Sequence, residues 1–179
     1  MNKTINEPIH YVSWCLAIAA CYFVIGKSML AISSSHVALV WPSAGLALGA
    51  LLVKGWKYWP AILLGAQLSN LNLPFGAALF IGVGSTLAAL FGWFLLIKVK
   101  HFSMATGNFR ELAAFVLYGC IISPIISALI GNISLLSYGF LDVNYFIDSF
   151  FKWWFGDAMG LLILGSMIIM IVSPYQGDN

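Results

Sequence analysis

The chain has 179 residues, of which 61% are hydrophobic and only 8% are charged, and its formal net charge is +2. So few charged groups cannot solvate the surface of a soluble domain of this length. The composition therefore excludes that class and predicts an all-α, polytopic transmembrane bundle in a lipid bilayer. The small net charge gives no indication of nucleic acid as a partner.

Six segments are apolar enough to span a membrane, or nearly so, since a spanning helix needs about 20 mainly apolar residues. We expect a tail at residues 1–11, a membrane domain of about six spans at residues 12–172, and a second tail at residues 173–179. The predicted spans are Val12–Ile32, Val37–Val53, Trp56–Leu71, Phe75–Ile97, Leu112–Ser137 and Phe150–Val172.

The basic residues are distributed unevenly between the two predicted sides of the membrane. One predicted side holds two basic residues, Lys27 and Lys152, and the other side holds six. Because loops rich in Lys and Arg stay in the cytoplasm, this asymmetry predicts that both the N- and C-termini are cytoplasmic. The basic residues on the predicted cytoplasmic side are Lys3, Lys54, Lys57, Lys98, Lys100 and Arg110.

Small residues recur at four-residue spacing in five of the predicted spans. Such stripes let helix backbones approach closely in lipid, so they predict a tightly packed bundle and say nothing specific about chemistry. The helix-packing residues that we expect are Gly45, Gly49, Gly84, Ser127, Gly131, Gly156 and Gly160.

No arrangement of residues typical of an enzyme stands out in the sequence. There is no nucleophile beside a plausible base, no pair of carboxylates within a span and no phosphate-binding glycine loop. The three histidines, His10, His36 and His101, lack the spacing of a metal site. We therefore expect no catalysis, no bound metal and no cofactor.

The segment Trp153–Asp157 places one carboxylate at the head of an uninterrupted apolar run, Ala158–Val172. An acid that faces lipid at mid-bilayer costs roughly 2.5–3.5 kcal/mol on insertion scales. We therefore expect Asp157, in the first turns of the last span, to face other helices or water. Two roles are open for it: it satisfies free N–H groups at the helix start, or it contacts a ligand.

The polar residues of the spans are predicted to gather in the outer half of the bundle, given the helical rise of about 1.5 Å per residue. This distribution favours a pocket that opens to the outside or to the outer leaflet and binds an unknown small ligand. Gln67 and Asn70 share a side of their helix and also suit hydrogen bonds between helices, and Trp41 also suits an interfacial anchor. The expected ligand-binding residues are Trp41, Pro42, Gln67, Asn70 and Asp157.

Two motifs carry a family resemblance: W-P-x-A-G at Trp41–Gly45 and, in the last span, W-W-x-G-D-A-x-G at Trp153–Gly160. In sequence and order they resemble the first membrane-associated sensor domain family of bacteria, and the resemblance covers about Trp41–Met170. That family often shows G-N-T-x-E on its fourth span, where Gly84–Ala88 here reads G-S-T-L-A and lacks both the amide and the acid. A proline usually follows the last motif, where this chain has Ser166.

The resemblance implies an integral membrane sensory domain of the bacterial inner membrane that takes part in signal transduction, for example in a two-component system. Members are generally fused on their C-terminal side to a cytoplasmic histidine kinase or diguanylate cyclase domain. No such domain lies within these 179 residues, so residues 173–179 are expected to lead to an output domain that is fused or separate. A homodimer of the chain is also considered.

Two other functions are open at this stage. A small membrane transporter or channel would need a continuous polar path and would show flux in proteoliposomes. A non-sensing membrane scaffold would assemble through its small-residue stripes without responding to any ligand.

Overall fold

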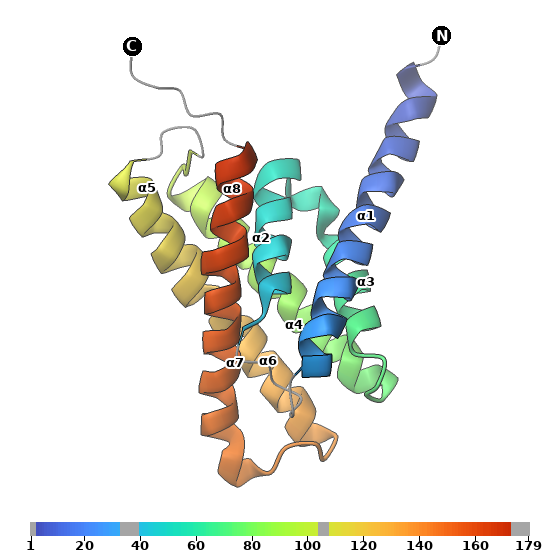
Figure 1. The fold of residues 1–179 in the computed structure, drawn as a ribbon, viewed down its shortest axis with the longest axis vertical. Coiled ribbons are helices and arrows are strands. Elements are labelled where there is room, and N and C mark those ends of the chain that lie inside the picture. Colours follow the sequence, from blue (N-terminus) through green and yellow to red (C-terminus); the bar gives the residue numbers. More distant parts are fainter. Residues whose placement is uncertain (1–2, 33–39, 104–107, 173–179) are drawn as a thin grey trace.

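The computed structural model describes residues 3–32, 40–103 and 108–172, and all regular structure within these ranges is helical. Most of the helices run along the long axis of the molecule (Figure 1). This confirms the all-α prediction. The α-helices are α1 (Lys3–Ile32), α2 (Pro42–Lys54), α3 (Trp59–Ser69), α4 (Phe75–Phe94), α5 (Phe109–Ala114), α6 (Pro124–Ser137), α7 (Phe146–Gly160) and α8 (Ser166–Val172).

Short helical segments of other geometry join several of these helices into longer ones. Stretches with the wider π-helical turn continue α4 (Leu95–Val99), connect α5 to α6 (Phe115–Ile122) and connect α7 to α8 (Leu161–Gly165), while 3-10 turns precede α3 (Trp56–Tyr58) and α7 (Val143–Tyr145). Four of the resulting helices are long and apolar enough to cross a membrane, which makes the chain a multi-pass membrane protein. They are Glu7–Ile32, Phe75–Val99, Phe109–Ser137 and Val143–Val172.

The second and third predicted spans are shorter in the structure than the sequence suggested. Helix α2 has 13 residues and α3 has 11, which at 1.5 Å per residue gives lengths of about 20 Å and about 17 Å. Both fall short of the roughly 30 Å hydrocarbon core of a bilayer. A count of about six spans therefore stays a prediction, and residues 37–39 of the predicted second span lie outside the described residues.

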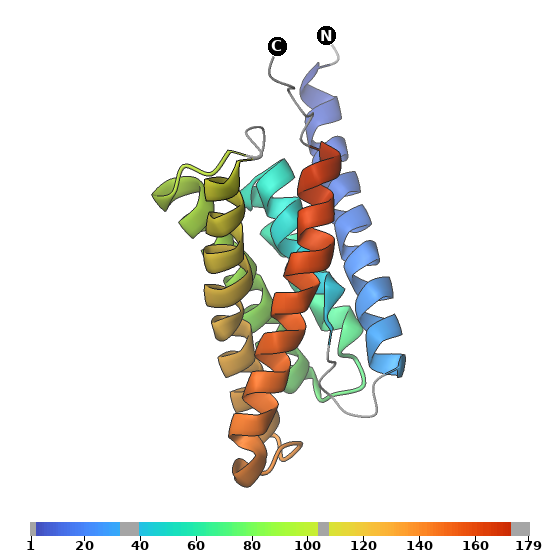
Figure 2. The same ribbon diagram turned by 60° about the vertical axis from the view of Figure 1, so that its left-hand side comes forward.

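Helix α2 is the central element of the bundle. It contacts α1, α4, α7 and α8, and it buries most of its side chains, with Leu48 and Leu51 completely inaccessible to solvent. Around it, α1 packs on α3, α3 on α4, α4 on α6 and α6 on α7 (Figure 2). A short apolar helix of this length is typical of a buried core helix.

The start of α1 and the end of α8 lie at the same end of the molecule in both views (Figures 1 and 2). The first helix begins at Lys3, so residues 3–11 extend it where the sequence predicted a separate tail. Contacts with the segment before α3 hold this extension: the Tyr11 hydroxyl donates to the Lys57 carbonyl at 2.9 Å, and the Tyr11 and Tyr58 rings lie 5.0 Å apart.

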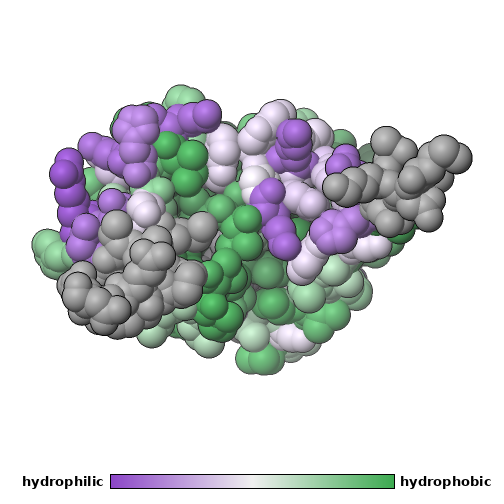
Figure 3. Space-filling model, turned by 90° about the horizontal axis from the view of Figure 1, so that it is seen from above, coloured by the Kyte–Doolittle hydropathy of each residue, from purple (hydrophilic) through white to green (hydrophobic). Residues whose placement is uncertain are grey.

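Hydrophilic residues gather at this same end, seen from above in Figure 3 with hydrophobic residues between them. The end of α2, the turn before α3, the segment after α4 and the start of α5 all lie here, and their five basic residues are exposed. The structure thus brings these loops to one end of the bundle, as the predicted topology requires. That this end faces the cytoplasm stays a prediction. The five residues are Lys54, Lys57, Lys98, Lys100 and Arg110.

The last long helix begins earlier than predicted, at Val143 rather than Phe150. The Asp142 carboxylate caps the new start by accepting from the Asn144 N–H at 2.8 Å, and an Asp148–Lys152 ion pair of 2.6 Å supports the first turns of α7. Asp157 therefore lies near the middle of this 30-residue helix, not in its first turns. Of the two roles left open for Asp157, the capping of a helix start is therefore excluded.

Candidate functional site

Asp157 is a buried acid with one satisfied and one unsatisfied oxygen. Its residue surface is 4% exposed, so the side chain is turned toward other helices and away from lipid, as expected. Its Oδ2 is hydrogen-bonded to the Ser127 hydroxyl on α6, and that hydroxyl also lies 2.9 Å from the Pro124 carbonyl oxygen. Its Oδ1 is buried without a hydrogen-bond partner in the described part of the chain. Buried polar atoms without partners are uncommon, and each calls for a physical explanation such as a functional role or a contact with water or an ion.

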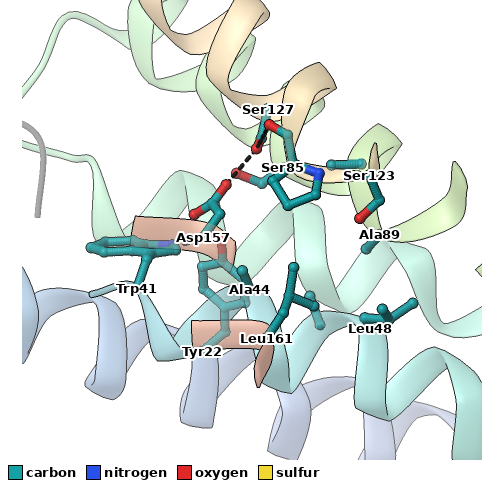
Figure 4. Close-up of a pocket in the computed structure, with 13 residues that line it drawn as sticks. Tyr22, Trp41, Ala44, Leu48, Ser85, Ala89, Ser123, Ser127, Asp157 and Leu161 are labelled. Atoms are coloured by element: carbon teal, nitrogen blue, oxygen red, sulfur yellow. Dashed lines mark hydrogen bonds between the residues drawn. The ribbon is translucent and has the colours of Figure 1, made fainter. Parts of the chain in front are cut away.

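A small cavity adjoins this carboxyl group (Figure 4). Its volume, taken as the space open to the centre of a water molecule, is about 10 Å³, which is room for about one water. Residues from all four long helices and from α2 surround it, so the cavity lies where most elements of the bundle meet. The lining residues are Tyr22, Trp41, Ala44, Ala47, Leu48, Ser85, Ala88, Ala89, Ser123, Pro124, Ser127, Asp157 and Leu161.

The polar groups of the cavity are hydroxyls and one indole. Tyr22 on α1 is 1% exposed, and the Trp41 indole donates to its hydroxyl at 3.4 Å. The Ser123 hydroxyl donates to the Gly119 carbonyl of its own helix at 2.9 Å. No Lys, Arg or His lines the cavity, so no positively charged side chain from the described residues neutralises Asp157 there.

The start of α2 meets α7 beside the cavity through backbone contacts. The Trp41 N–H donates to the Gly156 carbonyl at 2.8 Å. A Cβ atom on Gly160 would collide with the Trp41 carbonyl and would lie 2.9 Å from the Pro42 nitrogen, and one on Gly45 would collide with the Gly160 carbonyl. Glycine is required where backbones approach this closely. The structure therefore brings Trp41 and Pro42 next to the acid of α7.

The other two predicted ligand residues lie away from this cavity, around the α3–α4 connection. Gln67 donates to the Phe75 carbonyl over a long contact of 3.5 Å, and its side-chain oxygen is buried with no hydrogen-bond partner among the described residues. Asn70 follows α3 directly and donates to the Ala66 carbonyl at 2.9 Å. Neither side chain lines the cavity beside Asp157. The sequence placed all five residues in one site because it could give depth along a helix but not the direction of each side chain.

Three residues that the sequence reasoning did not assign to the site belong to it: Tyr22, Ser85 and Ser127. Tyr22 stands in a long apolar run, where a buried phenol needs a partner, and this signal could have identified it. Ser85 occupies the position of the amide in the fourth-span pattern, and Ala88 occupies the position of the acid. Both line the cavity, so Asp157 is the one acid among its lining residues.

The remaining expected packing residues lie at helix contacts. A Cβ atom on Gly49 would lie 2.9 Å from the Ile168 side chain of α8, and one on Gly84 would lie 3.0 Å from Ile130 of α6. One on Gly131 would lie 2.5 Å from the Trp153 ring of α7. These positions join α2 to α8, α4 to α6 and α6 to α7, and they hold the helices that surround the cavity.

Comparison with known proteins identifies the family. No curated protein and no solved structure matches the chain. The family model MASE1, membrane-associated sensor domain 1, matches residues 12–177, which is nearly the whole chain and includes every residue that lines the cavity. The chain belongs to the MASE1 family and is an integral membrane sensory module.

Proposed function

We propose that this chain is the signal-input module of a bacterial inner-membrane receptor. It senses a small ligand or a state of the membrane at the Asp157 cavity and passes the signal to a cytoplasmic histidine kinase or diguanylate cyclase. The observation that carries this proposal is the buried Asp157 carboxyl group, which lines a cavity at the junction of the bundle and has one oxygen without a hydrogen-bond partner among the described residues. Ionisable residues inside membrane proteins are costly and are candidates for function.

The position of the cavity suits an input site because it couples several helices at once. The carboxyl group links α7 to α6 through Ser127, and the neighbouring Gly156 carbonyl links α7 to the start of α2. A ligand that binds one packing of these helices more tightly than another shifts the equilibrium between them. A change at Asp157 therefore alters contacts among three helices, α2, α6 and α7.

The last helix provides a route from the cavity to the end of the bundle. From Asp157 the chain continues through the π-helical turn at Leu161–Gly165 and then through α8, which ends at the same end of the molecule as the start of α1. The π-helical turn packs against α2. Such turns are rare within α-helices and are frequent at functional sites. We propose that this turn lets the end of α8 move relative to α2.

The small size of the cavity favours an input site over a transport route. A volume of about 10 Å³ holds about one water and does not form a path for a solute. Transporters place substrate sites near the midplane together with polar groups along a route through both halves.

The test is a fusion of residues 1–179 to a diguanylate cyclase domain, with the cyclic dinucleotide measured in cells. Asp157→Asn is compared with wild type and with Asp148→Asn, which changes an exposed acid on the same helix. We expect Asp157→Asn to alter the output and Asp148→Asn to leave it unchanged at equal protein levels in the membrane. Equal output and equal stability of all three proteins would overturn the proposed site.

A further inference from the structure

We propose that the ligand of this site is a proton. Asp157 is a neutral carboxylic acid in the packed bundle, and loss of its proton is the event that changes the packing. This inference rests on the proposed function only for its consequence in signalling. The protonation of Asp157 itself follows from the geometry of the site and can be tested without any output domain.

The number of hydrogens around Ser127 indicates that Asp157 is a neutral acid. Its hydroxyl carries one hydrogen but faces two acceptors, Asp157 Oδ2 and the Pro124 carbonyl oxygen at 2.9 Å. An ionised Asp157 has no hydrogen to offer, so one of these two contacts would lack a hydrogen. A protonated Asp157 donates from Oδ2 to the Ser127 oxygen, and Ser127 then donates to Pro124. Only the neutral acid gives each contact its own hydrogen.

The described residues that line the cavity also provide no positive charge to balance an ionised Asp157. The hydroxyl groups that line the cavity with Asp157 are those of Tyr22 from α1, Ser85 from α4 and Ser123 and Ser127 from the helix Phe109–Ser137. Helix α2 contributes its N-terminal end, whose dipole favours an anion. A helix dipole offsets only part of the cost of burying an ion, and a buried carboxylate needs a charged partner or several donors. The carboxyl group is hydrogen-bonded to Ser127, and the Trp153 indole on α7 is a further neutral donor beside it. Neither of these donors in the described part of the chain carries a charge.

The small volume of the cavity also favours a proton as the ligand. An organic ligand does not fit a cavity of about 10 Å³ in this packing, whereas a proton needs no space and its transfer needs one water. Asp157 lines the cavity, and its Oδ1 has no hydrogen-bond partner among the described residues, so the carboxyl group keeps an available acceptor for a single entering water. A monovalent metal ion is the competing ligand of similar size, and it would require an ionised Asp157.

Deprotonation changes the contacts that hold three helices together. The proton leaves Oδ2 for water, and the single hydrogen of Ser127 turns from the Pro124 carbonyl to the new carboxylate. The negative charge then draws water into the cavity between α2, α6 and α7. Because Trp41 and Gly156 join α2 to α7 immediately beside this point, hydration of the cavity strains the α2–α7 contact.

The experiment is infrared difference spectroscopy of the full chain in lipid nanodiscs during a pH titration in potassium buffer. A protonated carboxyl group gives a carbonyl stretching band that shifts on deuteration and is lost when the proton leaves. We expect this band at neutral pH in wild type and in Asp148→Asn, its absence in Asp157→Asn, and its disappearance at alkaline pH. Ser127→Ala removes the acceptor of the carboxyl hydrogen and should shift the frequency of the band.

Wild type labelled with carbon-13 aspartate assigns the band to an aspartate even if Asp157→Asn does not fold, because the band must move with the label. Among the described aspartates only Asp157 is buried, and Asp142 and Asp148 are exposed. A neutral-pH spectrum of wild type without a label-sensitive carboxylic acid band would overturn the proposal. Loss of the band at neutral pH on replacing potassium with sodium would also overturn it, in favour of a metal-ion site. A band that behaves as expected, together with a cyclase fusion that ignores Asp157→Asn, would retain the proton site and reject the proposed sensing function.

Discussion

The carbonyl of Trp41 and the α-carbon of Gly160 are in contact where α2 begins against α7, so closely that no Cβ fits between them. This contact lies one turn beyond Asp157 and beside the Trp41–Gly156 hydrogen bond. The two family motifs therefore meet in space: the W-P-x-A-G motif starts α2, and the small residues of the last motif make room for it. Their pairing explains the glycine in each motif, because Gly160 lies against the Trp41 carbonyl and Gly45 lies against the Gly160 carbonyl.

Gly160→Ala should destabilise the bundle because the added methyl meets backbone of α2, which cannot move aside as a flexible side chain can. Overpacking of this kind costs about 1–3 kcal/mol or more of unfolding free energy. Gly165→Ala is the matched control on the same long helix, since its nearest neighbour is the edge of the Phe115 ring at 3.1 Å. Unfolding measured in mixed detergent should give a much lower unfolding free energy for Gly160→Ala than for Gly165→Ala. Equal stability of the two variants would contradict the close approach.

Ser127→Ala should lower the unfolding free energy by about 1–3 kcal/mol, the cost of leaving a buried polar group without its partner. Ser123→Ala is the control, because Ser123 lines the same cavity one turn earlier but donates to the carbonyl of Gly119 on its own helix. Unfolding curves should show that Ser127→Ala is less stable than Ser123→Ala. A Ser123→Ala loss as large as that of Ser127→Ala would argue against a specific bond to Asp157.

Ala88→Glu should place a second carboxyl group at the cavity that Asp157 already occupies. Two carboxyl groups in one site cannot easily both ionise, so removal of protons becomes more costly for the packed state. Ala88→Gln has the same shape without the ionisable group. The stability difference between the two variants should widen as the pH rises, and a constant difference across the pH range would show that position 88 does not face Asp157.

Ser134→Ala tests the packing of α4 against α6 away from the cavity. The Ser134 hydroxyl donates across the helices to the Ala77 carbonyl at 3.0 Å. Hydrogen bonds of this type in membrane proteins contribute about 0.6 kcal/mol on average and up to about 1.7 kcal/mol. Ser137→Ala, which removes an exposed hydroxyl bonded within its own helix, should cost less. The reverse order would place the α4–α6 contact elsewhere.

The sequence predicted the helical class, the family and the burial of Asp157, because apolar composition and a lone acid in an apolar run have strong physical consequences. It did not predict that α2 is short. The segment Trp41–Lys54 is as apolar as a spanning helix, and only the position of its first helical residue makes the helix shorter than a span. The predicted span began at Phe150 and not at Val143 because aromatic residues suit a membrane surface and an extension of the last helix equally well. Helix length moved Asp157 from the predicted outer end to the middle of its helix.

The candidate site was predicted only in part. Depth along each helix grouped Gln67 and Asn70 with Asp157, but rotation about the helix axis turns them toward the α3–α4 connection. Conversely, Ser85 was missed because a single small hydroxyl in an apolar span gives no indication of the helix it faces. The phenol of Tyr22 indicates that a partner is needed, but it does not indicate which helix supplies that partner. Side-chain direction depends on which helices pack together, and the periodicity of one chain does not contain that information.

The most direct test of the account is the output of the cyclase fusion, purified into nanodiscs so that the same buffer reaches both faces, measured as the pH is raised in small steps. The isolated cyclase domain is measured in parallel to remove its own pH dependence. The account predicts that the corrected output of the wild-type fusion changes with pH and that Asp157→Asn, which carries no titratable proton at this position, gives a flat profile. Identical pH profiles for wild type and Asp157→Asn would contradict the claim that the state of this carboxyl group is the signal.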